Sequence, residues 1–192
     1  SDTVFQRLLW KEYRVQRGFW LSMAGVAVAA QVVVMLVREP YLSPLYWLFG
    51  LAFGVPAFYA LGCGATLFAA EREDGTLEQL RVLAAPAWKV WWSKFSFAVA
   101  STVGLIVLLW FVAFILVPRP MRPVEVTDIQ ALCAPWAVAA VEFLGWGIFF
   151  SLLTKRPLNA ACMAAVASLG SLLVVSWIGS TSRPLGPGRY DD

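Results

Sequence analysis

The chain consists of long apolar stretches separated by short polar segments. A helix rises about 1.5 Å per residue, so about 20 apolar residues are enough to cross the roughly 30 Å hydrocarbon core of a bilayer. Five stretches reach that length, at residues 18–37, 45–70, 95–117, 131–153 and 158–179. We therefore predict an all-α polytopic membrane protein with its transmembrane domain at residues 18–179.

The two ends of the chain have different patterns from the spans. Residues 1–17 are amphipathic: the apolar residues that share a helical face are Phe5, Leu8, Leu9 and Tyr13. A basic amphipathic helix before a span is typical of a segment that lies in the membrane interface. The alternative is a positively charged flank with no structural role. Residues 180–192 are polar and contain Pro and Gly, which predicts a tail.

Residues 71–94 form the longest polar interruption, between the second and third predicted spans. Gly75 breaks the chain, and Thr76 and Gln79 follow at the spacing of a capping box, in which each side chain bonds the backbone N–H of the other residue. Leucines at helical spacing come next, as on the apolar edge of a helix. We therefore predict a short capped helix between two membrane spans.

Lys and Arg are distributed unequally among the segments that join the spans. With the N-terminus inside, two thirds of the 15 Lys and Arg residues fall on the cytoplasmic side. Membrane proteins have more positive residues on that side. The distribution therefore predicts a cytoplasmic N-terminus, and it places residues 71–94 where a cytoplasmic partner can reach them.

The motif in residues 71–94 also resembles a known family. Acidic residues, then Gly-Thr-Leu-Glu, a Leu-rich turn, a Pro and a downstream Lys resemble the permease subunits of the type-two class of ATP-binding-cassette exporters. In that family this segment is the coupling helix, which docks on the ATPase subunit. The resemblance implies that the ATPase contact residues are Glu71, Glu73, Gly75, Thr76, Leu77, Glu78, Leu80 and Arg81.

The resemblance has further implications for partners and location. It implies a separate P-loop ATPase subunit that binds the ATP, a second permease copy or homologue, and insertion in the cytoplasmic (inner) membrane. The family usually has six spans per half, whereas we predict five here. The chain is therefore expected to be a shorter variant or to lack a last span after Asp192.

Composition argues against several classes of function. Only 14% of the residues are charged and 60% are hydrophobic, which fits a membrane protein in a lipid bilayer. No His is present, so the commonest general base and metal ligand are missing. The 3 Cys residues are far apart within apolar segments, which argues against a disulfide or zinc site. A net charge of +3 without a basic run does not indicate nucleic-acid binding. We expect no catalytic residues, no metal and no cofactor in this chain.

Glu142 is the candidate polar site inside the membrane, because it lies at the middle of the fourth predicted span. A charge at that depth costs about 2.5–3.5 kcal/mol on insertion scales and needs a partner, a proton or a wet cavity. One interpretation is a contact for a polar substrate or a proton. The other is a neutral carboxyl hydrogen-bonded to a neighbouring helix, with Gln31, Ser101 or Ser168 as candidate partners.

These observations favour a permease subunit of an ATP-driven exporter, with ATP hydrolysis on another subunit. The main alternative is a small, non-transporting membrane subunit that scaffolds a larger complex. An intramembrane enzyme is the weakest interpretation, because one membrane carboxylate without His or a Cys pair is no catalytic constellation.

The predicted topology can be tested by labelling. In a Cys-free background, a single Cys at Asp74 should react with an impermeant reagent from the cytoplasmic side, and one at Arg119 from the opposite side. Labelling of both from the same side would contradict the arrangement of five spans.

Overall fold

The computed structural model describes residues 2–37, 44–73, 75, 86–117 and 126–181. These residues contain five α-helices: α1 (Asp2–Leu36), α2 (Pro44–Glu73), α4 (Ala87–Leu116), α5 (Val126–Leu153) and α6 (Pro157–Thr181). Each helix is long and apolar enough to cross a membrane. The prediction of an all-α protein is therefore confirmed for the described residues, with five helices that can each span a membrane, and the chain is a polytopic membrane protein.

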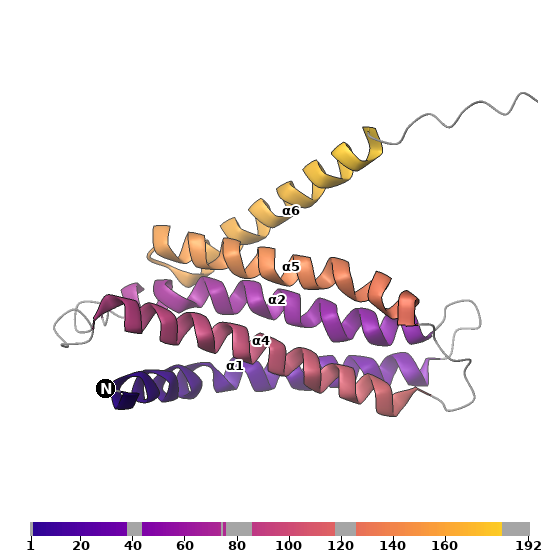
Figure 1. Cartoon of the computed structure of the whole chain (residues 1–192), viewed down its shortest axis with the longest axis horizontal. Coiled ribbons are helices and arrows are strands. Elements are labelled where there is room, and N and C mark those ends of the chain that lie inside the picture. The colour runs from indigo at the N-terminus through magenta and orange to yellow at the C-terminus, as the bar shows by residue number, and fades with distance from the viewer. Residues whose placement is uncertain (1, 38–43, 74, 76–85, 118–125, 182–192) are drawn as a thin grey trace, which may run out of the picture.

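Successive helices run in opposite directions, as spans joined by short segments must. Figure 1 shows α1, α2, α4 and α5 side by side, with α6 leaving the bundle at an angle. The end at which α1 begins also contains the end of α2 and the start of α4 (Figure 1). We call this the basic end, because every Lys and Arg that the structure describes lies in this half. They are Arg7, Lys11, Arg14, Arg17, Arg72, Lys89, Lys94, Lys155 and Arg156.

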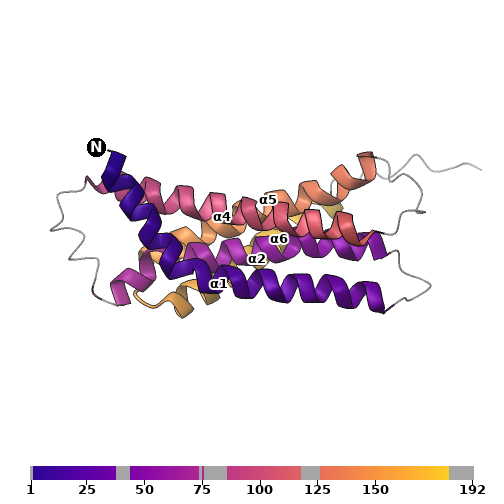
Figure 2. The same ribbon diagram turned by 90° about the horizontal axis from the view of Figure 1, so that it is seen from below.

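The helices extend beyond some of the predicted spans. The third span was predicted to begin at residue 95, whereas α4 begins at Ala87 and includes the tryptophans before the span. The predicted interfacial segment 1–17 and first span 18–37 form one continuous helix, α1. Figure 2 shows that the N-terminal part of α1 is bent away from the axis of the rest. Location of that part in the membrane interface stays a prediction.

Helix α2 is the centre of the bundle and contacts each of the other four helices. In the most apolar 18-residue stretch of α2, 61% of the residues are buried, against 17–28% in the corresponding stretches of the other helices. Small side chains allow α2 to take this central position. Within lipid the hydrophobic effect does not drive helices together, so they associate through close packing of their backbones. The fully buried alanines of α2 are Ala52, Ala57, Ala60, Ala65 and Ala69.

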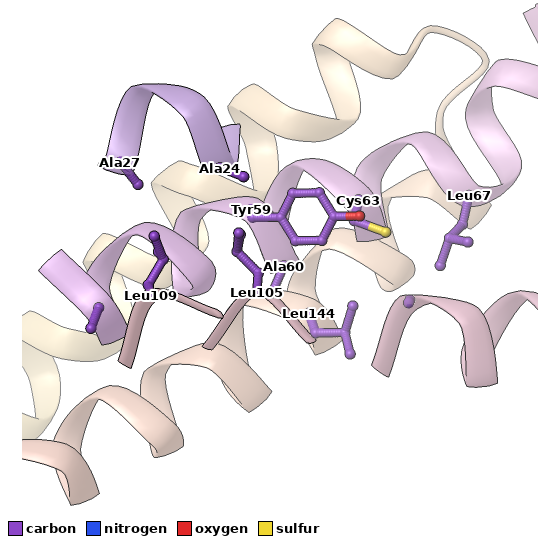
Figure 3. Close-up of a cluster of buried hydrophobic side chains, with 11 residues drawn as sticks. Ala24, Ala27, Tyr59, Ala60, Cys63, Leu67, Leu105, Leu109 and Leu144 are labelled. Carbon is purple, nitrogen blue, oxygen red and sulfur yellow. The ribbon is translucent and has the colours of Figure 1, made fainter. Parts of the chain in front are cut away.

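The largest apolar cluster lies where α1, α2, α4 and α5 meet (Figure 3). Tyr59 of α2 is fully buried at its middle, beside Cys63 on the same helix. Leucines of α4 and α5 and two alanines of α1 pack around it. The tyrosine hydroxyl is 3.1 Å from Ser101 Oγ on α4, which satisfies its polar end inside the cluster.

Helices α2 and α5 touch through their backbones at one point. A Cβ on Gly64 would lie 2.9 Å from the carbonyl oxygen of Leu144, and a Cβ on Gly147 would lie 2.7 Å from that of Leu61. Real Cβ atoms essentially never lie closer than 3.0 Å to a neighbour. Only residues without a side chain therefore fit at Gly64 and Gly147.

A single glutamine joins α1 to two other helices. Gln31 is fully buried, and its amide nitrogen lies 3.2 Å from the carbonyl oxygens of both Leu48 on α2 and Leu109 on α4. Inside a membrane such hydrogen bonds between helices contribute about 0.6–2 kcal/mol each. Gln31 therefore fixes the rotation of α1 at its apolar half.

The glycine contact predicts a position-specific effect on stability. Gly64→Ala or Gly147→Ala should lower the free energy of unfolding by roughly 1–3 kcal/mol, because the added methyl forces α2 and α5 apart. Gly145→Ala is the matched control on the same helix, since nothing lies within 4 Å of its added Cβ. Thermal unfolding of the purified variants in detergent measures the difference. Equal stability of all three would contradict the backbone contact.

Candidate functional site

Lys94 is the centre of a buried cluster of charges at the basic end. Its ammonium nitrogen lies 2.8 Å from Glu12 Oε1, 3.0 Å from Glu71 Oε1 and 2.8 Å from the carbonyl oxygen of Leu67. An ammonium group has three N–H donors, so each can meet one of these acceptors. Only 3% of the Lys94 side chain is exposed. Lys94 is therefore fully partnered by protein groups.

A second lysine balances the charge of the cluster. Lys11 Nζ lies 2.8 Å from the same oxygen of Glu71, and 42% of its side chain is exposed. We call Lys11, Glu12, Glu71 and Lys94 the ion cluster. Two ammonium groups and two carboxylates leave it without net charge. That balance matters because a buried charge without a counter-ion is strongly destabilising.

The ion cluster joins three helices that are far apart in sequence. Glu12 lies on α1, Glu71 in the last turn of α2, and Lys94 near the start of α4. Glu71 and Lys94 therefore stand on the two helices that lead into and out of the segment between α2 and α4. One ammonium group fixes both helices at the base of that segment and attaches α1 to them.

The sequence analysis did not find this cluster. It did not single out Glu12 or Lys94, and it assigned Glu71 to the ATPase contact. The structure buries the Glu71 side chain to 10% exposure between two lysines, whereas Glu73 is exposed at the end of α2. The sequence does contain one sign of a polar contact on α1: Glu12 and Gln16 are four residues apart, so they share one face of the helix. In the structure both side chains are buried.

Gly75 lies two positions after Glu73, the last residue of α2. Its φ of 69° lies in the left-handed region, which glycine adopts without strain and which commonly ends a helix. The chain break predicted at Gly75 is therefore confirmed. The other residues expected at the ATPase contact lie outside the described residues; they are Thr76, Leu77, Glu78, Leu80 and Arg81.

Glu142 occupies the middle of α5 and is partly exposed. Its Oε1 accepts hydrogen bonds from Trp146 Nε1, at 3.3 Å, and from the hydroxyl of Ser171 on α6. No described Lys or Arg forms an ion pair with it. The carboxyl group therefore joins α5 to α6 by hydrogen bonds and has no basic partner in the described part of the chain.

The partners predicted for Glu142 are wrong, although a hydrogen bond to a neighbouring helix is present. Gln31 bonds two backbone carbonyls, and Ser101 is the partner of Tyr59. Ser168 bonds the carbonyl of Ala164 within its own helix. Ser171, one turn further along α6, takes the predicted role, and the sequence alone could not fix this register between α5 and α6.

Chemistry at a metal centre has no support in the described residues, where no group of three His, Cys, Asp or Glu side chains lies close enough to hold an ion. No protein-family model, curated protein or solved structure matches this chain. The ion cluster and Glu142 are therefore the two described features that bear on the function of the chain.

The ion cluster predicts a large effect of removing its central charge. Lys94→Met leaves Glu12 and Glu71 buried together without the ammonium group, and should lower the free energy of unfolding by roughly 3–5 kcal/mol. The double variant Lys94→Met/Glu12→Gln should recover part of the loss, because it removes one uncompensated charge. Thermal unfolding in detergent measures both.

Lys89→Met is the matched control for this prediction. Lys89 lies on the same helix, its ammonium lies 5.6 Å from the Trp88 ring, and it forms no ion pair with the described residues. We expect a change below about 1 kcal/mol, as for exposed cation–π contacts. If Lys94→Met is no less stable than Lys89→Met, the ion cluster does not hold the three helices together.

Proposed function

We propose that this chain is the transmembrane permease subunit of an ATP-driven exporter of the ATP-binding-cassette type. A separate P-loop ATPase subunit would hydrolyse ATP, and this chain would move the substrate across the membrane. The observation that supports the proposal best is the position of the ion cluster. It lies at the base of the segment that resembles the family's coupling helix.

A coupling element has to pass a push from a soluble subunit to the membrane spans. A flexible attachment would absorb that push. Here α2 and α4, which flank the segment, are held together through Glu71 and Lys94. Glu12 adds α1 to the same contact at 2.8 Å. A force on the segment would therefore displace three helices as one unit.

The central place of α2 extends this unit to the rest of the bundle. Helix α2 contacts α5 and α6 as well as α1 and α4. Its backbone touches that of α5 at Gly64 and Gly147, where neither residue has a side chain that could move aside. Packed interiors resist compression and transmit strain. Movement at the basic end would therefore reach α5 with little loss.

The partners follow from the same proposal. The sequence has no P-loop motif, so ATP is expected on the ATPase subunit and no nucleotide on this chain. A second permease copy or homologue is expected beside it in the cytoplasmic membrane, with the N-terminus in the cytoplasm. The lipid bilayer surrounds the exposed apolar faces of the helices.

The proposal predicts graded effects within the coupling segment. Leu80→Asp should abolish co-purification of the ATPase and substrate-linked ATP turnover, because a charge placed in an apolar contact costs several kcal/mol. Thr76→Ala should weaken both, since loss of a helix cap costs about 1 kcal/mol. Glu78→Lys should give a smaller, salt-dependent effect, as reversal of a rim charge does. Pull-down in mild detergent and ATP hydrolysis assays measure these effects.

Lys155→Glu provides the control variant, because Lys155 is exposed at the basic end in the separate turn between α5 and α6. It should leave ATPase association unchanged. All variants should reach the membrane in normal amounts. If Leu80→Asp retains full ATPase association, the coupling-helix assignment is wrong, and a scaffolding subunit becomes the better interpretation.

A further inference from the structure

Glu142 differs from the ion cluster in having no basic partner among the described residues and in being only partly covered. Both of its hydrogen bonds to the described residues end on the same oxygen, Oε1. The carboxylate lies at mid-span, where an ionisable residue marks a functional site unless it is compensated. A positively charged ligand is the partner that would supply the missing compensation.

The outer face of α5 provides space beside this carboxylate. Residues three, four and seven positions after Glu142 share its face of the helix, and these are Gly145, Trp146 and Phe149. Gly145 has no side chain, and nothing lies within 4 Å of the position of a Cβ there. The face of α5 is therefore open at Gly145, and the ring of Phe149, one turn further along the helix, is 49% exposed.

Aromatic rings follow Gly145 on α5. Trp146 packs edge-on against Phe149, with ring centroids 6.0 Å apart, and stacks on Phe150 at 5.8 Å. Aromatic faces attract cations, most strongly where water is excluded. A carboxylate next to a group of rings is therefore suited to a cation that has an apolar body.

Helix α6 leaves this region open to the bilayer. Its buried residues, Ala160, Ala164 and Ser168, all precede Ser171. From Leu172 to Val175 every residue is exposed. Figure 1 shows α6 diverging from α5 along this part. Ser171, and with it Glu142, therefore lies where the two helices separate, and a ligand dissolved in the membrane can approach from the side.

We propose that Glu142 is the anionic group of a binding site for lipophilic cations that enter from the bilayer between α5 and α6. Ser171 and Trp146 orient the carboxylate through Oε1, and Phe149 contacts the apolar body of the cation. The inference rests on the proposed function only for the transport that follows binding, and it names the substrate class. Binding itself requires this chain alone.

Tetraphenylphosphonium is the probe for the test, with tetraphenylborate as an anion of the same shape. Binding is measured by equilibrium dialysis on the purified chain in lipid nanodiscs. The chain should bind the phosphonium and bind the borate at least about tenfold more weakly, a difference of about 1.4 kcal/mol. Glu142→Gln, which keeps the size and an acceptor oxygen, should lower phosphonium affinity by about tenfold or more.

Two further variants separate the site from general effects on folding. Gly145→Leu keeps the carboxylate and fills the open space, and should also prevent phosphonium binding. Arg156→Gln removes an exposed charge at the basic end, outside both sites, and should leave affinity unchanged. Thermal unfolding of each variant identifies any that fail to fold, and such a variant is replaced by Phe149→Leu, for which a smaller loss of affinity is expected.

Equal binding of phosphonium and borate, or unchanged phosphonium affinity in both folded Glu142→Gln and Gly145→Leu, overturns the proposal. So does a change of oligomeric state in Glu142→Gln with phosphonium affinity retained, because the carboxylate then serves contact with a second copy. In the complex with the ATPase, phosphonium should stimulate ATP turnover only while Glu142 is present. If specific phosphonium binding occurs and no ATPase associates, the proposed function fails and the binding site stands.

Discussion

The bundle depends on how closely its central helix can approach its neighbours. In lipid, apolar side chains gain little by leaving the solvent, so helices associate through close packing and hydrogen bonds between them. Helix α2 satisfies this constraint with alanines and glycines, and at Gly64 and Gly147 its backbone touches that of α5. The positions of the other helices follow from this central contact, because each of them packs on α2.

The two sides of α2 use different interactions. Toward α5 and α6 the contacts are mostly apolar and close, apart from the hydrogen bond that Arg72 of α2 donates to the carbonyl oxygen of Leu152 on α5. Toward α1 and α4 polar groups dominate: Gln31 bonds both α2 and α4, Tyr59 bonds Ser101, and Lys94 bonds Glu12 and Glu71. Hydrogen bonds and ion pairs are directional, so they fix one register between neighbouring helices. Apolar surfaces of Leu and Ala define that register poorly. The α1–α2–α4 side is therefore the part of the bundle with the most sharply defined geometry.

Length and hydropathy were sufficient to predict five spans, because the thickness of the bilayer sets the length of each helix. Glu142 was also recognisable, since a carboxylate in an apolar run is conspicuous by itself. Lys94 was not, because it stands at the end of a span, where Lys is common, and only the register between α1, α2 and α4 brings it to Glu12. Ser171 was missed for the same reason. Pairing between helices depends on rotation and offset, which the pattern along one helix does not contain.

The ion cluster and Glu142 are connected through the contact between α2 and α5. They differ in charge balance and in exposure. The charges of the ion cluster are paired with one another and all its side chains except that of Lys11 are buried, so its role in the proposed function is mechanical. Glu142 has no basic partner among the described residues and is partly exposed, and these two properties underlie the proposal that it binds a cation. Gly147 lies five residues from Glu142 on α5, about 7.5 Å along the helix. A displacement of α2 that begins at Glu71 would reach α5 at Gly147, through a backbone contact that cannot yield. Ser171 on α6 donates a hydrogen bond to the Glu142 carboxylate on α5. A shift of α5 against α6 would therefore change the hydrogen bonding of Glu142 and, at the same time, the space at Gly145. If both proposals hold, the affinity of Glu142 for a cation depends on the position of the basic end, which is the coupling that an exporter with a separate ATPase subunit requires.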